Sequence, residues 1–151
     1  MAVLTWPDVV AGLVSFGKTV TGIVGSYGGT TFREQLAESI LPCLLVIPPD
    51  DAQIERFGAM GANGVIRARL THALFYWPKG NTRKPLPETL PALDQLFWNY
   101  AVALKALPFL TDASSPSLHH PAKPKAKFGE LVWQKKKYDG ISFYYDVEIN
   151  Y

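Results

Sequence analysis

The sequence predicts an α+β fold: a mostly antiparallel four-stranded sheet with an N-terminal helix, one long amphipathic helix packed on it and a C-terminal β-hairpin. Two periodic patterns predict it. Residues 141–151 alternate between apolar and polar side chains, as a half-buried strand does, whereas residues 88–107 repeat apolar side chains every three or four positions, as a helix does. The 151 residues, of which 48% are apolar and 19% charged, suit one folded domain spanning residues 1–151.

The first helix is predicted from its capping residues. Thr5 can cap the helix, Pro7 suits the first turn, and Asp8 stands at the capping-box position. Apolar residues then share one face, at spacings of three and four, from residue 9 to residue 24. Because glycines interrupt this pattern, we expect the helix to fray after Lys18.

A second, shorter helix and the first strand are expected next. Thr31 and Glu34 have the spacing of another capping box, which predicts a short helix through Ala37 or Ser39. Residues 41–49 form an apolar run bounded by prolines, which predicts a short strand buried on both faces.

The middle of the chain combines two loops with a long strand. We expect a loop over residues 49–64, in which residues 52–57 could add a turn of helix. Residues 65–77 alternate and are predicted to be a strand. This run is long for a strand, so it is expected to bend or to extend past the sheet. Residues 78–87 are expected to form a second loop.

The long helix has a defined start and end in the sequence. Pro91 fits only the first turn of a helix, so the helix is expected to begin near Glu88 or Thr89. Pro108 ends it.

The C-terminal hairpin is predicted from its turn signal, Asp139-Gly140. A two-residue loop would place apolar residues of the first strand opposite acidic residues of the second. A three-residue loop, Tyr138–Gly140, pairs residue 137 with residue 141 and places Trp133 opposite Tyr145. We therefore predict the three-residue loop.

Few residues suggest catalysis or metal binding. His119 and His120 could bind a metal together with Asp112, but no further Cys or His lies at zinc-finger spacing, so we interpret them as solvated. A single cysteine, Cys43, excludes a disulfide within the chain and lies in an apolar strand, where it is expected to act as a small hydrophobic residue. His72 lies on the apolar face of its strand and is interpreted as a structural histidine rather than a catalytic base.

Two acids and a set of basic residues are the other candidate functional residues. Asp50 and Asp51 could serve as an acid–base pair, but acids after two prolines are also ordinary turn and cap residues. Lysines on a predicted hairpin commonly protect a sheet edge, and they could also contact DNA phosphate or an acidic protein. The formal charge of +2 is too small to argue for a nucleic-acid-binding protein. The basic residues in question are Lys123, Lys125, Lys127, Lys135, Lys136 and Lys137, with Lys79, Arg83 and Lys84 in the preceding loop.

Residues 111–127 differ in composition from the rest of the chain. They are rich in Pro, Ser, His and Lys and can neither hold a helix nor bury apolar surface. A loop of this length is either disordered in the isolated subunit or ordered by a partner, and both interpretations stay open.

The sequence predicts neither a signal peptide nor a membrane span. No basic region precedes the apolar N-terminal residues, and the apolar run at residues 40–49 is too short to cross a bilayer. We expect the protein in a cytoplasm, or in a particle assembled in one.

The order of these elements resembles the tail terminator and related tail-completion (neck) proteins of long-tailed bacteriophages. Residues 41–48 resemble the first core strand of these proteins, residues 88–107 their packing helix, and residues 138–151 their closing hairpin. The resemblance implies a virion structural protein without catalysis, cofactor or metal. It implies a homo-oligomeric ring, typically of six subunits, that caps the tail tube, faces the head connector or stopper protein and lets DNA pass. Assembly would take place in the host cytoplasm.

Candidate contact residues follow from this resemblance. The contact loops would be residues 49–64, 78–87 and 111–127, and Tyr144 stands out because it falls on the polar side of its strand. The candidate contact residues are Asp50, Asp51, Lys79, Arg83, Lys84, Lys123, Lys125, Lys127, Lys135 and Tyr144.

Three other interpretations stay open. The chain could be another head–tail joining protein or a tail tube subunit. It could instead bind a small molecule in an aromatic site near His72, Tyr76 and Tyr100. It could also bind nucleic acid through the lysines together with Tyr144 and Trp133, which predicts binding that weakens steeply with salt.

Overall fold

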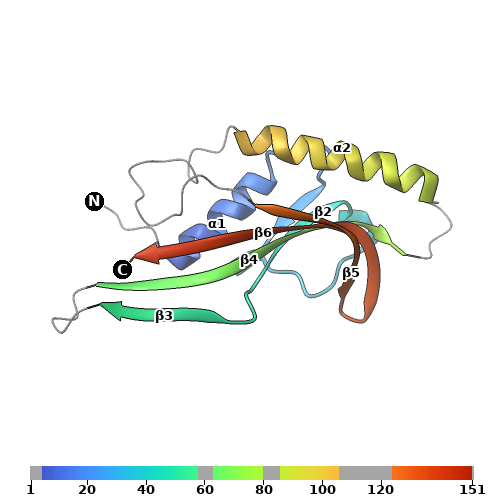
Figure 1. The fold of residues 1–151 in the computed structure, drawn as a ribbon. Coiled ribbons are helices and arrows are strands. Elements are labelled where there is room, and N and C mark those ends of the chain that lie inside the picture. Colours follow the sequence, from blue (N-terminus) through green and yellow to red (C-terminus); the bar gives the residue numbers. More distant parts are fainter. Residues whose placement is uncertain (1–4, 58–62, 80–85, 106–123, 151) are drawn as a thin grey trace.

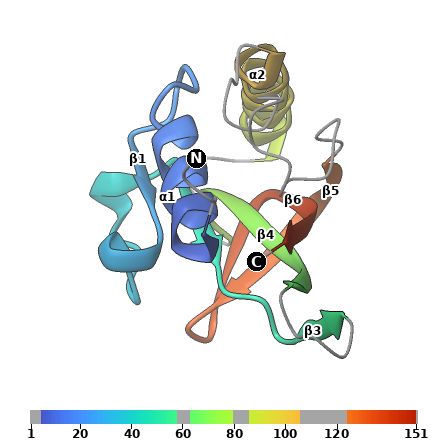
Figure 2. The ribbon, with the colours of Figure 1, turned by 90° about the vertical axis from the view of Figure 1, so that its left-hand side faces the viewer.

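A mixed sheet of six strands carries two helices on one face (Figures 1 and 2). The computed structural model describes residues 5–57, 63–79, 86–105 and 124–150. The helices are α1 (Trp6–Gly17) and α2 (Leu86–Lys105), and the strands are β1 (Gly25–Tyr27), β2 (Cys43–Ile47), β3 (Ala52–Phe57), β4 (Asn63–Pro78), β5 (Lys125–Trp133) and β6 (Lys136–Asn150). The strand order is β1-β2-β4-β6-β5, and β3 pairs with β4 beyond the end of β2.

The α+β class is confirmed, but the predicted sheet of four mostly antiparallel strands is too small. β1 and β3 were not expected, and β1 pairs with β2 in the parallel direction. β1 is only three residues long, too short for a periodic pattern to reveal it.

Helix α1 begins as its capping residues predict. The backbone N–H of Asp8 donates to Oγ1 of Thr5 at 3.3 Å, and the N–H of Thr5 donates to Oδ2 of Asp8 at 2.9 Å. This capping box also lowers the pKa of Asp8, because backbone and side-chain hydrogen bonds from Thr5 favour the carboxylate. The helix ends at Gly17, next to the position where fraying was expected.

The predicted helix at residues 31–39 is wrong. This segment holds two short 3-10 turns, Gly29–Thr31 and Glu38–Ile40. The Thr31 hydroxyl bonds backwards, accepting from the N–H of Gly28 and donating to its carbonyl, so it cannot cap a helix that follows. The chain between the turns instead delivers Phe32 and Leu36 to a second hydrophobic core.

Strand β2 is buried on both faces, as predicted. Leu44 and Val46 face α1 and α2 in the first core, whereas Cys43 and Leu45 face the second core on the opposite side of the sheet. That second core packs against the segment that follows β1 and against the end of the β5–β6 hairpin.

Strand β4 is longer than β2, and this difference leaves room for β3 to pair with β4. β2 pairs with residues 71–75 of β4, which leaves residues 63–68 free on the same side. β3 fills that position, from Ala52 opposite Ala68 to Phe57 opposite Asn63, so the predicted loop with a turn of helix is wrong over residues 52–57. Figure 1 shows the β3–β4 ribbon extending away from the helices.

The predicted hairpin turn is also wrong. The turn lies at Gln134 and Lys135, whose φ values of 49° and 66° are those of a two-residue turn between antiparallel strands. Trp133 therefore pairs with Lys136 rather than with Tyr145.

Gly140 explains why the Asp139-Gly140 signal is misleading. Gly140 lies inside β6, opposite Gly129 on one side and Phe75 on the other, where β4 has a bulge. A Cβ at this position would collide with the carbonyl oxygen of Leu74. The glycine therefore permits close strand packing instead of a turn.

Helix α2 and strand β6 lie close to the residue ranges that the sequence patterns predict. α2 begins at Leu86 and includes Pro91 in its interior, so its start lies slightly before the predicted position. The apolar side chains of β6 face the first core as predicted; they are Ile141, Phe143, Tyr145 and Val147.

We predict that Lys135→Gly raises the free energy of unfolding by about 1 kcal/mol, because a non-glycine residue in the left-handed region costs roughly 1–2 kcal/mol. Urea unfolding measures the change. Lys136→Gly is the matched control: it places glycine in β6 and should lower stability. Equal effects of the two substitutions would contradict a turn at residues 134–135.

Candidate assembly surface

Three polar side chains, His72, Tyr100 and Tyr145, are hydrogen-bonded in a row inside the first core. Nδ1 of His72 lies 2.8 Å from the hydroxyl oxygen of Tyr100, which is also hydrogen-bonded to the hydroxyl of Tyr145. Their side chains are enclosed, with exposed fractions of 0%, 1% and 4%. The ring of Tyr100 stacks on Phe143, with 3.6 Å between centroids. These three hydrogen-bonded side chains therefore join α2 to β4 and β6 across the first core.

Burial determines the protonation states of His72, Tyr100 and Tyr145. It lowers the pKa of His72 to about 3 and raises the pKa values of Tyr100 and Tyr145, so all three groups are neutral near neutral pH. The interpretation of His72 as a structural histidine agrees with this position. The aromatic site expected near His72, Tyr76 and Tyr100 is filled by packed side chains, because Tyr76 is also buried.

The other candidate chemical groups are separated from one another. Cys43 is fully buried, and burial raises the pKa of its thiol to about 12, as suits a small hydrophobic residue. Asp50 and Asp51 are exposed where the chain enters β3. Within the described residues, no three His, Cys, Asp or Glu side chains are grouped to hold a metal ion. The His119 and His120 pair lies outside the described residues.

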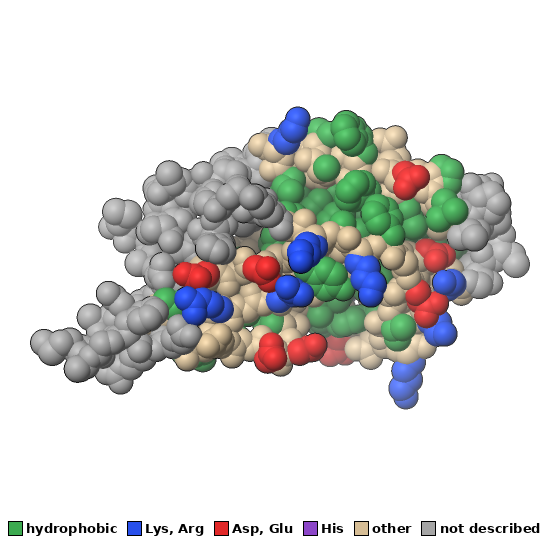
Figure 3. All heavy atoms as spheres, viewed as in Figure 1, with side chains coloured by type: hydrophobic (Ala, Val, Ile, Leu, Met, Phe, Trp, Pro, Cys, Tyr) green, Lys and Arg blue, Asp and Glu red, His purple; other side chains and the backbone are tan. Residues whose placement is uncertain are grey.

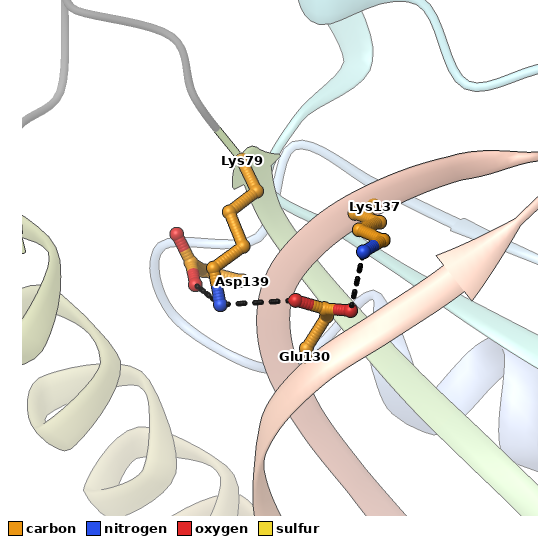
Figure 4. Close-up of polar contacts among 4 residues, drawn as sticks. All are labelled: Lys79, Glu130, Lys137 and Asp139. Atoms are coloured by element: carbon orange, nitrogen blue, oxygen red, sulfur yellow. Dashed lines mark ion pairs between the residues drawn. The ribbon is translucent and has the colours of Figure 1, made fainter.

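Lys79 belongs to a network of ion pairs (Figure 4). Nζ of Lys79 lies 3.1 Å from a carboxylate oxygen of Glu130 and 3.9 Å from one of Asp139, and Nζ of Lys137 lies 3.6 Å from the other oxygen of Glu130. The backbone N–H of Lys79 also donates to the carbonyl of Lys137 at 2.8 Å. These contacts join the end of β4 to the β5–β6 hairpin. Lys79, a candidate partner contact, thus already has partners within the chain.

Tyr144 lies on the sheet face opposite the helices. It pairs in register with Thr71 of β4 and Lys125 of β5, and the guanidinium of Arg69 lies 5.9 Å from the centre of its ring. Beside it, Arg69 pairs with Asp146 at 3.1 Å and Arg67 with Glu148 at 3.0 Å. Next to Tyr144 this face carries a ladder of ion pairs, and the position of Tyr144 on the polar side of β6, predicted from the alternation, is confirmed.

The other candidate contact lysines in the described residues lie on β5 or in the turn that follows it. Lys125 and Lys127 are exposed on this strand, and Lys135 is exposed in the hairpin turn. Arg83, Lys84 and Lys123 lie outside the described residues.

Large apolar side chains are exposed close to these lysines. We call the set formed by Leu90, Trp98, Val102 and Phe128 the α2–β5 face. Trp98 is 64% exposed and Val102, one turn later, 50% exposed. The ring of Phe128 lies 5.1 Å from that of Phe97, which joins α2 to β5 at this place. Figure 3 shows hydrophobic side chains along α2 and beneath it, next to Lys and Arg side chains.

A separate apolar cleft of about 590 Å³ lies between α1, the turn at residues 28–31 and the end of β2. Its walls include Trp6, Val10, Val14 and Val46. The sequence patterns did not indicate this cleft, because its walls come from segments that are far apart in the chain.

No protein-family model matches this chain, and a search of curated proteins finds no significant relative. In the described part of the chain, no helix is long and apolar enough to cross a membrane.

We predict that His72 makes the protein less stable as the pH falls below about 6.5. The unfolded chain then binds a proton at this imidazole, whereas the folded chain keeps it neutral down to about pH 3. Between pH 7 and pH 5 this group should remove about 2 kcal/mol from the free energy of unfolding. Urea unfolding of the wild type and of His72→Gln at both pH values isolates the contribution. An identical pH dependence of the two proteins would contradict it.

Proposed function

We propose that this chain is a non-enzymatic structural subunit that assembles with copies of itself into a ring. Following the resemblance to tail terminators of long-tailed bacteriophages, the ring would cap the tail tube and join it to the head connector or stopper protein. Six subunits are the expected number, and DNA would pass through the ring. The protein would then belong to the tail or neck of the virion, after assembly in the host cytoplasm.

The α2–β5 face is the observation that carries this proposal. Trp98 is 64% exposed, Val102 50% and Phe128 46%. Exposed clusters of large apolar side chains mark sites of association, and tryptophan is among the residues that contribute most to interfaces. By contrast, His72, Tyr100 and Cys43, whose pKa values are shifted by burial, lie in the core.

We predict that Trp98→Lys weakens self-association about tenfold or more, because it places a charge in the middle of the proposed contact. Light scattering over a range of protein concentrations measures the oligomeric state. Gln35→Lys is the matched control, since it adds the same charge at an exposed position in the segment between β1 and β2, away from α2, and should leave assembly intact. A wild-type protein that stays monomeric at about 100 μM and does not bind tail tubes would refute the proposal.

The cleft beside α1 favours a second candidate function, the binding of a small apolar ligand. Its volume of about 590 Å³ and its apolar walls suit such a molecule. Because Trp6 lines the cleft, a ligand there should change the tryptophan fluorescence of the wild type but much less that of Trp6→Phe.

A further inference from the structure

Basic residues surround Tyr144 on the sheet face opposite the helices. Lys125 of β5 pairs in register with Tyr144, and Lys127 pairs with Ser142, two residues before Tyr144 on β6. Residues directly opposite each other, and residues two apart on one strand, share a face of the sheet, so both lysines lie on the face of Tyr144. From β4, the guanidinium of Arg69 lies 5.9 Å from the centre of the Tyr144 ring. We call Arg69, Lys125, Lys127 and Tyr144 the Tyr144 patch.

The Tyr144 patch has an excess of positive charge. Arg69 is ion-paired with Asp146 at 3.1 Å, but the two side chains are 57% and 70% exposed, so water screens this pair. Lys125 and Lys127 are exposed, and neither belongs to an ion pair within the described part of the chain. The patch therefore places three cations next to one acid. Clustering of basic residues on one face is the electrostatic feature that nucleic-acid phosphates require.

Protection of a sheet edge accounts for the lysines but not for the aromatic ring beside them. Tyr144 is half-buried and belongs to neither hydrophobic core. An aromatic ring that is not used for packing, with cations around it, has the composition of a site for single-stranded nucleic acid. In such sites a base stacks on the ring while the cations contact the phosphates.

Trp133, which the sequence also suggested for nucleic-acid binding, does not belong to this patch. Its indole N–H donates to the carbonyl of Glu34 at 2.9 Å, and its ring lies 5.6 Å from that of Phe32, between centroids. Trp133 is therefore used to hold the second core together. Lys136 pairs with Trp133 and is eight residues from Tyr144 along β6, so the lysines at the hairpin turn are separate from the patch.

We propose that the Tyr144 patch binds single-stranded nucleic acid. A base would stack on the ring of Tyr144, and the three cations would contact phosphates on either side of that base. Because every base has a face that can stack, the site would select for an unpaired strand and not for a particular sequence. All four residues belong to one chain, so this inference goes beyond the proposed ring and does not rest on it.

Fluorescence anisotropy of a labelled oligo(dT) of about 12 nucleotides tests the proposal with the full-length protein. The wild type should bind this oligonucleotide. Its Kd should rise about 20-fold between roughly 50 and 200 mM salt, because contact with about three phosphates of a single strand gives a slope near −2 in a plot of log K against log salt.

Two variants separate the ring from the cations. Tyr144→Leu should weaken binding about tenfold and leave the salt dependence unchanged, because it removes the stacking surface but no charge. Lys125→Gln with Lys127→Gln should weaken binding and reduce the slope to about one third, because one of three phosphate contacts remains. Lys135→Gln with Lys136→Gln is the matched control: it removes the same charge at the hairpin turn and should change Kd by no more than about twofold. Circular dichroism verifies the fold of each variant.

Several results would overturn the proposal. One is a wild type that does not bind oligo(dT) at about 100 μM protein and low salt. Another is equal binding of a DNA duplex of the same length or of polyglutamate, which would show attraction to negative charge without stacking. A third is a folded Tyr144→Leu variant that binds like the wild type. The oligomeric state of the wild type, measured by light scattering, decides the proposed ring separately from all of these results.

Discussion

The antiparallel pairing of β4 with β6 supports every other element of the structure. The two strands pair from Val65 opposite Asn150 to Pro78 opposite Tyr138, and each is longer than an average strand. β2 and β3 share the other side of β4, and β5 occupies the other side of β6. The first core covers one face of this pair and the second core covers part of the other. A shift of one residue in this pairing would exchange the two faces.

The register of this pair depends on close packing at one glycine and on buried polar contacts. Gly140 admits the carbonyl of Leu74 where β4 has its bulge, so no larger residue fits without movement of the backbone. Further along, His72 and Tyr145 reach the same hydroxyl of Tyr100 from β4 and β6. In any other register, a buried hydroxyl or imidazole would lose its partner, which costs roughly 1–3 kcal/mol. Steric fit and polar pairing therefore select the same arrangement.

The elements that the sequence predicted correctly are those with local signals. Thr5 and Asp8 form their capping box within four residues, and the alternation in β6 predicts its buried face without knowledge of the partner strand. The errors arise where tertiary contacts decide. Asp139-Gly140 has the composition of a turn, but Gly140 is needed for packing against β4, and the turn forms at residues 134–135. Likewise, residues 52–57 form β3 by pairing with the part of β4 that β2 leaves unpaired. The α2–β5 face forms because β5 lies beside α2 in the folded chain.

Two groups of charged residues on the sheet have different consequences. Lys79, Glu130 and Lys137 are paired with one another, and Arg67 and Arg69 are paired with acids of β6, so these charges fix the strands of a single subunit. Lys125 and Lys127 are exposed on β5, which pairs with β6 alone among the described residues. Charge at an edge ordinarily prevents unwanted pairing. The lysines of β5 therefore protect an edge of the sheet, whereas the ion-paired residues hold its strands together.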